Sequence, residues 1–375
     1  MRLTAPWLIH PGTLAVFDAL AGHNAWFVGG CVRDGLLDQP VDDIDIATDA
    51  RPETVMECAK AAGLRVVPTG IDHGTVTVVA LDKPHEITTL RLDIETFGRH
   101  ATVAFSTDIA EDAARRDFTI NALYATREGA VIDPNGHGLA DLQARLVRFI
   151  GAPAQRIEED YLRILRFFRF HAWYADPEGG LDADGLAACA AHVDGLAGIA
   201  TERVTTEVMK LLAAPDSAPS VAAMAQSGVL QAILPGASAR LLTILSGLEP
   251  DANPIRRLAA LSEAPDLRLS RAEATQHALY RAEMEAGTAA GELGYRHGSD
   301  KARDILLLRA ALFEQPVDPD AITAAETGAA AVFPVKAADL MPALDGPALG
   351  QRLRALEQAW IDSGFTLSRA ALLEL

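Results

Sequence analysis

Short apolar runs separated by glycine, proline and charged residues fill roughly the first third of the chain, where they predict a small sheet. One run, 25–30, is continuous and ends at a pair of glycines, as expected for a buried strand. Two β-branched or alternating runs on either side of the turn-forming residues 82–84 predict a hairpin. The expected strands are 25–30, 43–47, 74–81 and 85–92, and the expected helices in this part are 31–37 and 52–62.

Helical periodicity replaces this pattern farther along the chain. The polar, glycine-containing segment 93–103 predicts a mobile loop. Residues 115–125 predict the start of a helix, and a short strand is expected to end at 131–134. Helical patterns dominate from about residue 158 to the end. The expected fold class is therefore α+β, with a small mixed sheet in an N-terminal head and an all-helical remainder.

Composition and charge narrow the class of protein. The 375 residues are 49% hydrophobic, enough for more than one core, and the net charge of −18 argues against a general polyanion binder. Arginines nevertheless concentrate between Arg91 and Arg169, so a nucleic-acid partner would have to contact a local basic patch. No run of 18 apolar residues predicts a membrane span, and residues 1–21 lack the pattern of a signal peptide.

The cysteines are scattered and odd in number, which argues against a disulfide framework and against a zinc site. They are Cys31, Cys58 and Cys189. This usage fits a reducing, cytoplasmic location. We expect a monomer or a weak homodimer.

Two carboxylates, Asp43 and Asp45, form the first candidate site. Residues two apart on a strand point to the same face, so both side chains can converge on one point. Their mutual repulsion there favours a divalent cation, and Mg²⁺ commonly combines one or two carboxylates with substrate phosphates. Asp42 has the wrong parity to join them. Glu86, on a neighbouring strand, is a further candidate ligand, although an isolated glutamate is more often a solvated side chain.

The segment Gly29-Gly30-Cys31-Val32-Arg33-Asp34 precedes these carboxylates and changes their interpretation. An isolated Asp-x-Asp is most often a solvated strand edge. A glycine pair, however, can bring backbone N–H groups close to a phosphate, with Arg33 one turn into the following helix. The combination predicts a metal-dependent enzyme that acts on a nucleoside triphosphate.

Arg115, Arg116 and Asp117 form a second constellation. Asp117 can cap the helix expected after it, and the arginines can contact a phosphate or a ribose. A surface Arg-Arg pair means little alone, so this motif gains weight only beside the carboxylate pair.

A charged stripe marks the helix predicted beyond residue 158. Its members, spaced three apart on one side of that helix, are Asp160, Arg163, Arg166 and Arg169. An amphipathic helix with solvated arginines is the ordinary alternative.

The first two members of the stripe suggest a way to select bases. Asp160 only accepts hydrogen bonds and Arg163 only donates them. Cytosine and adenine offer an amino donor beside a ring-nitrogen acceptor, whereas uracil and guanine offer the reverse order. An unpaired buried polar group costs about 1–3 kcal/mol, so a fixed Asp/Arg pair could select C and A without a nucleic-acid template.

With these three motifs in this order, the sequence resembles the class II CCA tRNA nucleotidyltransferases and their poly(A) polymerase relatives. It is most similar to CCA-adding enzymes that lack a fused HD domain. The motifs extend over roughly residues 26–170. The resemblance implies a polymerase-β-like nucleotidyltransferase head at 1–148, a helical neck with the base-recognition helix at 149–235, and a tRNA-binding body and tail at 236–375.

The resemblance also implies roles for individual residues. Asp43 and Asp45 would be the catalytic residues and the Mg²⁺ ligands, and they would activate a tRNA 3′-OH for in-line attack on the α-phosphate. The implied reaction adds CCA to tRNA 3′ acceptor ends from CTP and ATP and releases pyrophosphate. The nucleotide would be bound by Gly30, Arg33, Arg116, Asp117, Asp160, Arg163, Arg166 and Arg169.

Departures from the family pattern favour CCA addition over poly(A) synthesis. The sequence has no His-Asp dipeptide, and the basic segment typical of bacterial poly(A) polymerases is missing between Pro52 and Leu90. Asp93–His100 would correspond to the family's flexible loop. Poly(A) synthesis, CC-only addition, A-only addition and non-catalytic tRNA binding stay open as alternatives.

Overall fold

The computed structural model describes residues 1–71, 74–97, 100–176, 178–341 and 343–375. The chain forms two compact units, the first of residues 1–211 with 223–233 and the second of residues 212–222 with 234–375. The first unit contains the whole predicted head and most of the predicted neck. The predicted boundaries at 148 and 235 stay a prediction.

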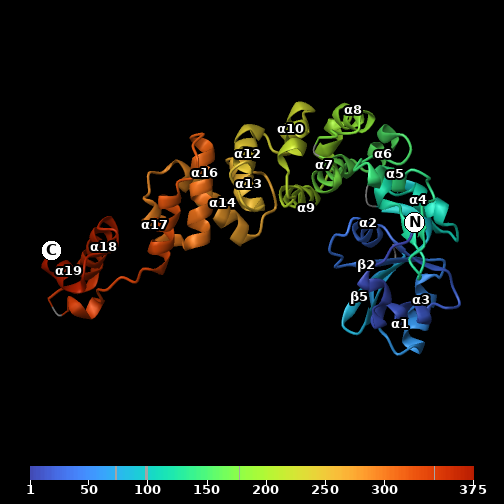
Figure 1. Cartoon of the computed structure of the whole chain (residues 1–375), viewed down its shortest axis with the longest axis horizontal. Coiled ribbons are helices and arrows are strands. Elements are labelled where there is room, and N and C mark those ends of the chain that lie inside the picture. Colours follow the sequence, from blue (N-terminus) through green and yellow to red (C-terminus); the bar gives the residue numbers. More distant parts are fainter. Residues whose placement is uncertain (72–73, 98–99, 177, 342) are drawn as a thin grey trace. The chain divides into compact units, whose positions relative to one another are not determined.

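A seven-stranded mixed sheet forms the centre of the head, drawn in blue to green in Figure 1. Its strands are β1 Ala25–Val28, β2 Ile44–Thr48, β3 Arg65–Gly70, β4 Thr75–Ala80, β5 Lys83–Thr89, β8 Tyr124–Ala125 and β9 Val131–Ile132. The strand order is β3-β4-β5-β2-β1-β8-β9, in which only β2 and β5 run parallel. The α+β class and the mixed sheet are confirmed, and β4 and β5 form the expected hairpin.

Short helices cover this sheet. They are α1 Pro11–Ala19, α2 Gly30–Leu36, α3 Pro52–Ala61, α4 Ile109–Ala114 and α5 Gly138–Gln143, with a 3₁₀ turn at Pro6–Ile9. Both α1 and α3 contact β4 and each other, so they cover the same face of the sheet. Helix α2 follows β1 directly and contacts β1 and β2. The chain therefore places the start of α2 beside the strand that carries Asp45.

Helices follow the head. They are α6 Pro153–Glu159, α7 Leu162–Tyr174, α8 Ala183–Ala191, α9 Thr201–Leu212, α10 Ala218–Gln226 and α11 Val229–Ile233, with a 3₁₀ turn at Val193–Gly198. All belong to the first unit except for residues 212–222, which include the first part of α10. Buried aromatic rings join α7 to the head. Phe118 lies 4.9 Å, between ring centroids, from both Phe149 and Phe170, and Phe149 stacks on Phe167 at 5.4 Å. Such pairs each stabilise by about 0.5–1.5 kcal/mol beyond the area they bury, and they fix α7 against the segment after Arg116.

The second unit is all-helical, as expected for this part of the chain. Its helices are α12 Ala239–Ser246, α13 Pro254–Leu261, α14 Arg271–Glu285, α15 Ala290–His297, α16 Ser299–Leu312, α17 Pro319–Ala330, α18 Gly346–Asp362 and α19 Arg369–Glu374, with a 3₁₀ turn at Ala337–Asp339. Arg256 and Arg257 are buried and both bind Glu249. Across the described parts of the chain, every helix is too short or too polar to cross a bilayer.

The mobile loop predicted at 93–103 is wrong for the described backbone. Strand β6 Arg91–Phe97 pairs antiparallel with β7 His100–Phe105 in a separate two-stranded sheet. Threonine, valine and phenylalanine favour strands, and here this preference outweighs the single glycine of the segment. Residues 98–99 and the side chains of 93–103 lie outside the described set, as does part of the proposed flexible loop.

The helix predicted at 115–125 is also wrong. Only a 3₁₀ turn, Thr119–Asn121, forms there before β8 begins. Backbone groups that a helix would use have other partners: the Phe118 N–H donates to Asp117 at 2.9 Å, and the Thr119 N–H donates to the Arg148 carbonyl at 3.0 Å. Such bonds compete with helix formation. Asp117 is consequently not a helix cap; the turn is preceded by Phe118, which gives no side-chain cap.

Candidate active site

The carboxylates Asp43 and Asp45 lie at the start of β2. The neighbouring strand β5 runs parallel to β2. Asp43 is exposed and directly precedes the strand, and Asp45 is half-buried within it. Glu86 of β5 is the register partner of Asp45, so it lies on a neighbouring strand, as the sequence predicted. Burial raises the pKa of Asp45 to about 6; Glu86 and Asp43 raise it further, and Arg116 and Arg33 oppose them. Neither Asp43 nor Asp45 has a side-chain hydrogen bond or ion pair with any residue that the structure describes.

This donor set fits a divalent cation that shares its ligands with a substrate. Among the described residues, no group of three or more histidine, cysteine, aspartate or glutamate side chains is arranged to hold a metal alone. Two carboxylates with unbalanced charge are nevertheless what Mg²⁺ commonly uses, with phosphates and water completing the shell. Glu86 stays unassigned as a ligand.

Gly29 lets the chain turn sharply from β1 into α2. Its φ of +71° lies in the region that favours glycine, and a Cβ atom there would lie 3.3 Å from Nη1 of Arg116. The Gly29 N–H donates to the Leu123 carbonyl at 3.0 Å, which ties the turn to the segment before β8. The two motifs that are distant in sequence, at Gly29 and at Arg116, are therefore in contact.

Arg33 is buried and held by four hydrogen bonds. Its Nε and Nη2 donate to the Asp34 carboxylate at 2.8 and 2.9 Å, and Nη1 donates to Oδ1 of Asn121 at 3.0 Å. Nη2 also donates to the Tyr174 hydroxyl at 2.7 Å. One N–H of the guanidinium is left for a ligand, since arginine has five.

Arg115 and Arg116 both bind Asp112 of α4. Arg115 reaches its Oδ1 at 2.7 Å and Arg116 reaches its Oδ2 at 3.0 Å. The Tyr124 hydroxyl donates to the same Oδ2 atom. Burial alone would raise the pKa of Asp112, but the two arginines and Tyr124 outweigh it and lower the pKa to about 2. This network orients Arg116 toward Gly29 and the carboxylate pair.

Asp117 links the head to α7. Its Oδ1 accepts from Asn121 Nδ2 at 3.1 Å, and its Oδ2 accepts from Arg166 Nε at 2.7 Å. Burial by itself would raise the pKa of Asp117, but Arg166 and the other donors hold that pKa well below its usual range. Glu207 of α9 continues the series, with Oε1 at 3.7 Å from Arg166 and Oε2 bound by Arg169 Nε. The structure thus brings Asp117, Arg166 and Arg169 together.

Asp160 and Arg163 differ from the predicted stripe in one respect. Asp160 lies between α6 and α7 in an extended conformation, because α7 begins only at Leu162. It accepts hydrogen bonds from Arg203 at 3.2 and 2.6 Å, whereas Arg163 donates to Glu159. The expectation that all four stripe residues share one helix face is wrong for Asp160, because the chain bends between two short helices.

Several residues in these contacts were not identified from the sequence. They are Asp112, Asn121, Tyr174, Arg203 and Glu207, each of which binds one of the predicted residues. Arg203 and Glu207 lie one turn apart on α9, and that spacing is the one signal that could have marked them. Their partners are far away in sequence, so only the fold reveals the pairing.

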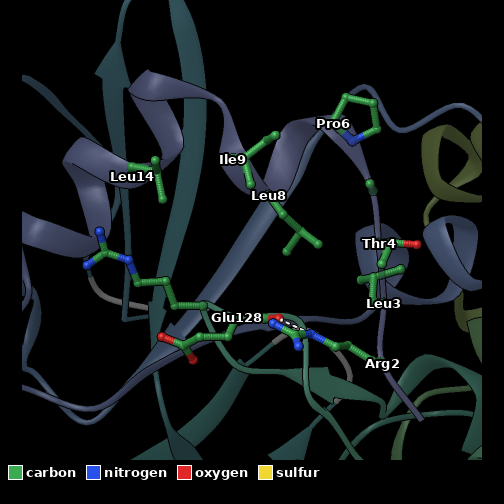
Figure 2. Close-up of a pocket in the computed structure, with 10 residues that line it drawn as sticks. Arg2, Leu3, Thr4, Pro6, Leu8, Ile9, Leu14 and Glu128 are labelled. Carbon is green, nitrogen blue, oxygen red and sulfur yellow. Dashed lines mark hydrogen bonds between the residues drawn. The ribbon is translucent and has the colours of Figure 1, made fainter.

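A pocket of about 770 Å³ lies elsewhere in the head (Figure 2). Leu3, Leu8, Ile9 and Leu14 give it an apolar wall, and Arg2 donates to the Glu128 carbonyl at 3.0 Å on another side. None of the residues predicted to bind a nucleotide lines this pocket. This pocket is therefore separate from the candidate site around Asp45, which is identified by its charged residues and their contacts.

Comparison with known proteins agrees with this geometry. Residues 25–148 match the family model described as the poly A polymerase head domain, and residues 181–241 match the probable RNA and SrmB-binding site of polymerase A. The head and part of the helical region after it are thus similar to these two parts of poly(A) polymerase. The first match includes the carboxylate pair and the Arg116 motif.

Curated relatives of the chain are named CCA tRNA nucleotidyltransferase or CCA-adding enzyme. The human mitochondrial CCA tRNA nucleotidyltransferase 1 is 45% identical over 191 residues, which are 51% of this chain and 44% of the relative. A CCA-adding enzyme of Geobacillus stearothermophilus is 40% identical over 217 residues, 57% of this chain and 52% of the relative. The chain thus spans about half the length of the curated relatives that it matches.

Solved structures extend the likeness to nearly the whole chain. The Bacillus stearothermophilus CCA-adding enzyme in complex with CTP has a TM-score of 0.69 and 28% identity, covering 95% of this chain and 94% of that one. The Thermotoga maritima CCA-adding enzyme complexed with tRNA has a TM-score of 0.70, covering 99% and 95%; at 17% identity it supports the fold alone.

Proposed function

We propose that the protein is a CCA tRNA nucleotidyltransferase that adds C, C and A to tRNA 3′ ends from CTP and ATP, releasing pyrophosphate. One observation carries the proposal: an unbalanced carboxylate pair lies in the same compact unit as an arginine and aspartate set suited to a nucleotide. The names of the relatives, which are CCA-adding enzymes from several organisms, support the choice of reaction.

Asp43 and Asp45 would hold Mg²⁺ in this enzyme. The bound ion would lower the pKa of the attacking 3′-OH and balance charge on the triphosphate. The protein's own part is to present two carboxylates at the start of β2 that pair with no described cationic side chain. Arg116, oriented by Asp112, would face the same region and contact the nucleotide.

The triphosphate would lie near the start of α2. Arg33 lies there, with Nη2 3.6 Å from where a Cβ on Gly30 would be, and one N–H of its Nη1 is not used by a described residue. Asp117 would lie near the ribose, with Arg166 and Arg169 supporting it from α7. Since these arginines are already balanced by Asp117 and Glu207, they would hold the nucleotide's surroundings in shape more than attract it.

Asp160 and Arg163 would read the base. Each is held by a separate partner, Arg203 for Asp160 and Glu159 for Arg163, and that reduces the freedom of both side chains. Asp160 keeps lone pairs to accept a base amino group, and Arg163 keeps donors for a ring nitrogen. The pair would therefore suit cytosine and adenine and leave uracil and guanine with unpaired groups.

Poly(A) synthesis is the second candidate, because the matching head-domain model carries the name poly A polymerase. CC-only and A-only addition remain possible outcomes of the same chemistry. The three cysteines, free in the described structure, remain consistent with the predicted cytoplasmic location.

One experiment separates these candidates. Purified protein is incubated with Mg²⁺, CTP, ATP and a tRNA that ends before its CCA, and the added nucleotides are sequenced. We expect C, C and A in that order and little further extension. A long A-tail without C would favour the poly(A) polymerase alternative, and C-C or A alone would identify a partial adding enzyme. No incorporation of any nucleotide would contradict the proposal.

A further inference from the structure

We propose that Tyr174 is a positioning residue that holds the Arg33 guanidinium and so joins the base-reading helix α7 to the triphosphate motif of the head. The inference rests on the proposed function. It assigns a role in nucleotide binding to a side chain outside all three sequence motifs.

The contact between Tyr174 and Arg33 is both polar and stacked. The Tyr174 hydroxyl accepts from Arg33 Nη2 at 2.7 Å, and the Arg33 Cζ lies 3.9 Å from the centroid of the Tyr174 ring. Phe170, one turn earlier on α7, has its ring centroid 5.2 Å from the same Cζ atom and 5.4 Å from the Tyr174 ring. Two aromatic side chains of α7 therefore enclose one cation of α2.

The remaining contacts of Arg33 come from the head. Asp34 and Asn121 take three of its N–H groups, so the guanidinium is fixed by α2, by the segment after Arg116, and by α7 together. With only 5% of its surface exposed, Arg33 cannot change rotamer without breaking the contact with α7. The free N–H consequently has a fixed direction only while Tyr174 is in place.

This arrangement has a consequence for the nucleotide. Arg163 lies in the first turn of α7, Asp160 lies just before this helix, and Tyr174 is its last residue, so one helix connects the base-reading end to the triphosphate end of the site. We infer that loss of the Tyr174 ring weakens triphosphate binding more than it slows the chemical step.

The test compares three variants of the full chain. Tyr174→Leu removes ring and hydroxyl, Tyr174→Phe removes only the hydroxyl, and Trp173→Phe is the matched control. Trp173 lies on the same turn of α7 and donates to the Lys210 carbonyl at 2.8 Å, so its variant also loses one hydrogen bond from that turn. Circular dichroism and urea unfolding check that each variant folds.

Single-turnover addition to tRNA gives the apparent KM and the maximal rate for CTP and ATP. For Tyr174→Leu we expect KM to rise about tenfold for both nucleotides while the maximal rate changes less than about threefold. Tyr174→Phe should raise KM only about twofold, since the stacked ring remains, and Trp173→Phe should leave KM unchanged. Equal KM values for wild type and Tyr174→Leu would overturn the inference, as would an equal rise in Trp173→Phe.

A double-variant cycle with Arg33→Lys tests whether Tyr174 acts through Arg33. In that background Tyr174→Leu should add less than about twofold to the dissociation constant of Mg-CTP, because the stacked guanidinium is already gone. If Tyr174→Leu raises the dissociation constant as much in the Arg33→Lys background as in the wild type, Tyr174 does not act through Arg33. The dissociation constant is measured without tRNA, so it does not depend on nucleotide addition. A wild type that binds Mg-CTP but does not extend tRNA would refute the proposed function, and the effect of Tyr174 on Mg-CTP binding could still be measured.

Discussion

Two pairs of aspartates in the head differ in whether arginine side chains bind them. Asp43 and Asp45 lie together without a cationic partner in the described structure, and the pKa of Asp45 is raised to about 6. Asp112 and Asp117 are more deeply buried, yet arginines and other donors lower their pKa values. Burial alone would raise the pKa values of Asp45, Asp112 and Asp117. The direction of the shift thus separates Asp45, which is open to an external cation, from Asp112 and Asp117, which hold the site in shape.

The arginines near the site are paired as well. Arg166 and Arg169 bind Asp117 and Glu207, and Arg33 binds Asp34. Most of the positive charge near the site is therefore structural, in a chain with a net charge of −18.

Removing one of the two unbalanced carboxylates should have the largest effect. We expect Asp43→Asn to slow nucleotide addition by at least about a thousandfold, since a metal ligand contributes several kcal/mol to the transition state. Single-turnover addition of CMP to tRNA measures the loss. The matched control is Asp42→Asn, an exposed neighbour, which should retain nearly full activity. Full activity of Asp43→Asn would contradict the metal assignment.

Acid should remove the stability that Asp112 gains from its arginine partners. The folded pKa of Asp112 is lowered to about 2, so its contribution to stability is present above its unfolded pKa, near 4, and is lost as pH falls toward 2. At neutral pH this amounts to about 2 kcal/mol. Urea unfolding should therefore show Asp112→Asn less stable than wild type at pH 6, with the difference shrinking between pH 4 and pH 2.

The control for this comparison is Asp18→Asn. Asp18 pairs with Arg127 at the surface, at 2.6 Å, and exposed pairs of this kind contribute about 0–1 kcal/mol. Its variant should show only a small loss. A difference for Asp112→Asn that stays constant down to pH 2 would show that the lost hydrogen bonds, and not the charge, are responsible.

The base-reading pair should give the smallest of the three effects. Exchanging Asp160 and Arg163 reverses acceptor and donor, so we expect discrimination of CTP against UTP to fall about tenfold. Competition between the two nucleotides in one reaction measures it. Arg203→Gln is a useful comparison, because it frees Asp160 from its partner while leaving the reading groups in place, and should change selectivity less. Unchanged selectivity in the exchanged variant would refute the template hypothesis.

The sequence predicted the local elements of the head where apolar runs and turn residues agree. It failed at 115–125, where Asp117 binds Asn121 and Thr119 binds Asp141, and at 93–103, where most of the segment folds back on itself as two paired strands. It also placed Asp160 on a helix that begins two residues later. In the first two cases the contacts that decide the conformation, such as strand pairing and side-chain hydrogen bonds, are not visible as a hydrophobic period.

By itself, the sequence determined the identity and order of the chemical groups: two carboxylates after a glycine turn, an Arg-Arg-Asp motif and a row of charges three residues apart. Spacing is a local property, so it could be recognised without a fold. Only the tertiary structure decided which charges are balanced, because ion pairs such as Asp117 with Arg166 and contacts such as Arg33 with Tyr174 join residues 49 and 141 positions apart. Whether a carboxylate serves a metal or an arginine depends on what lies within a few ångströms of it, and that distance is set by packing.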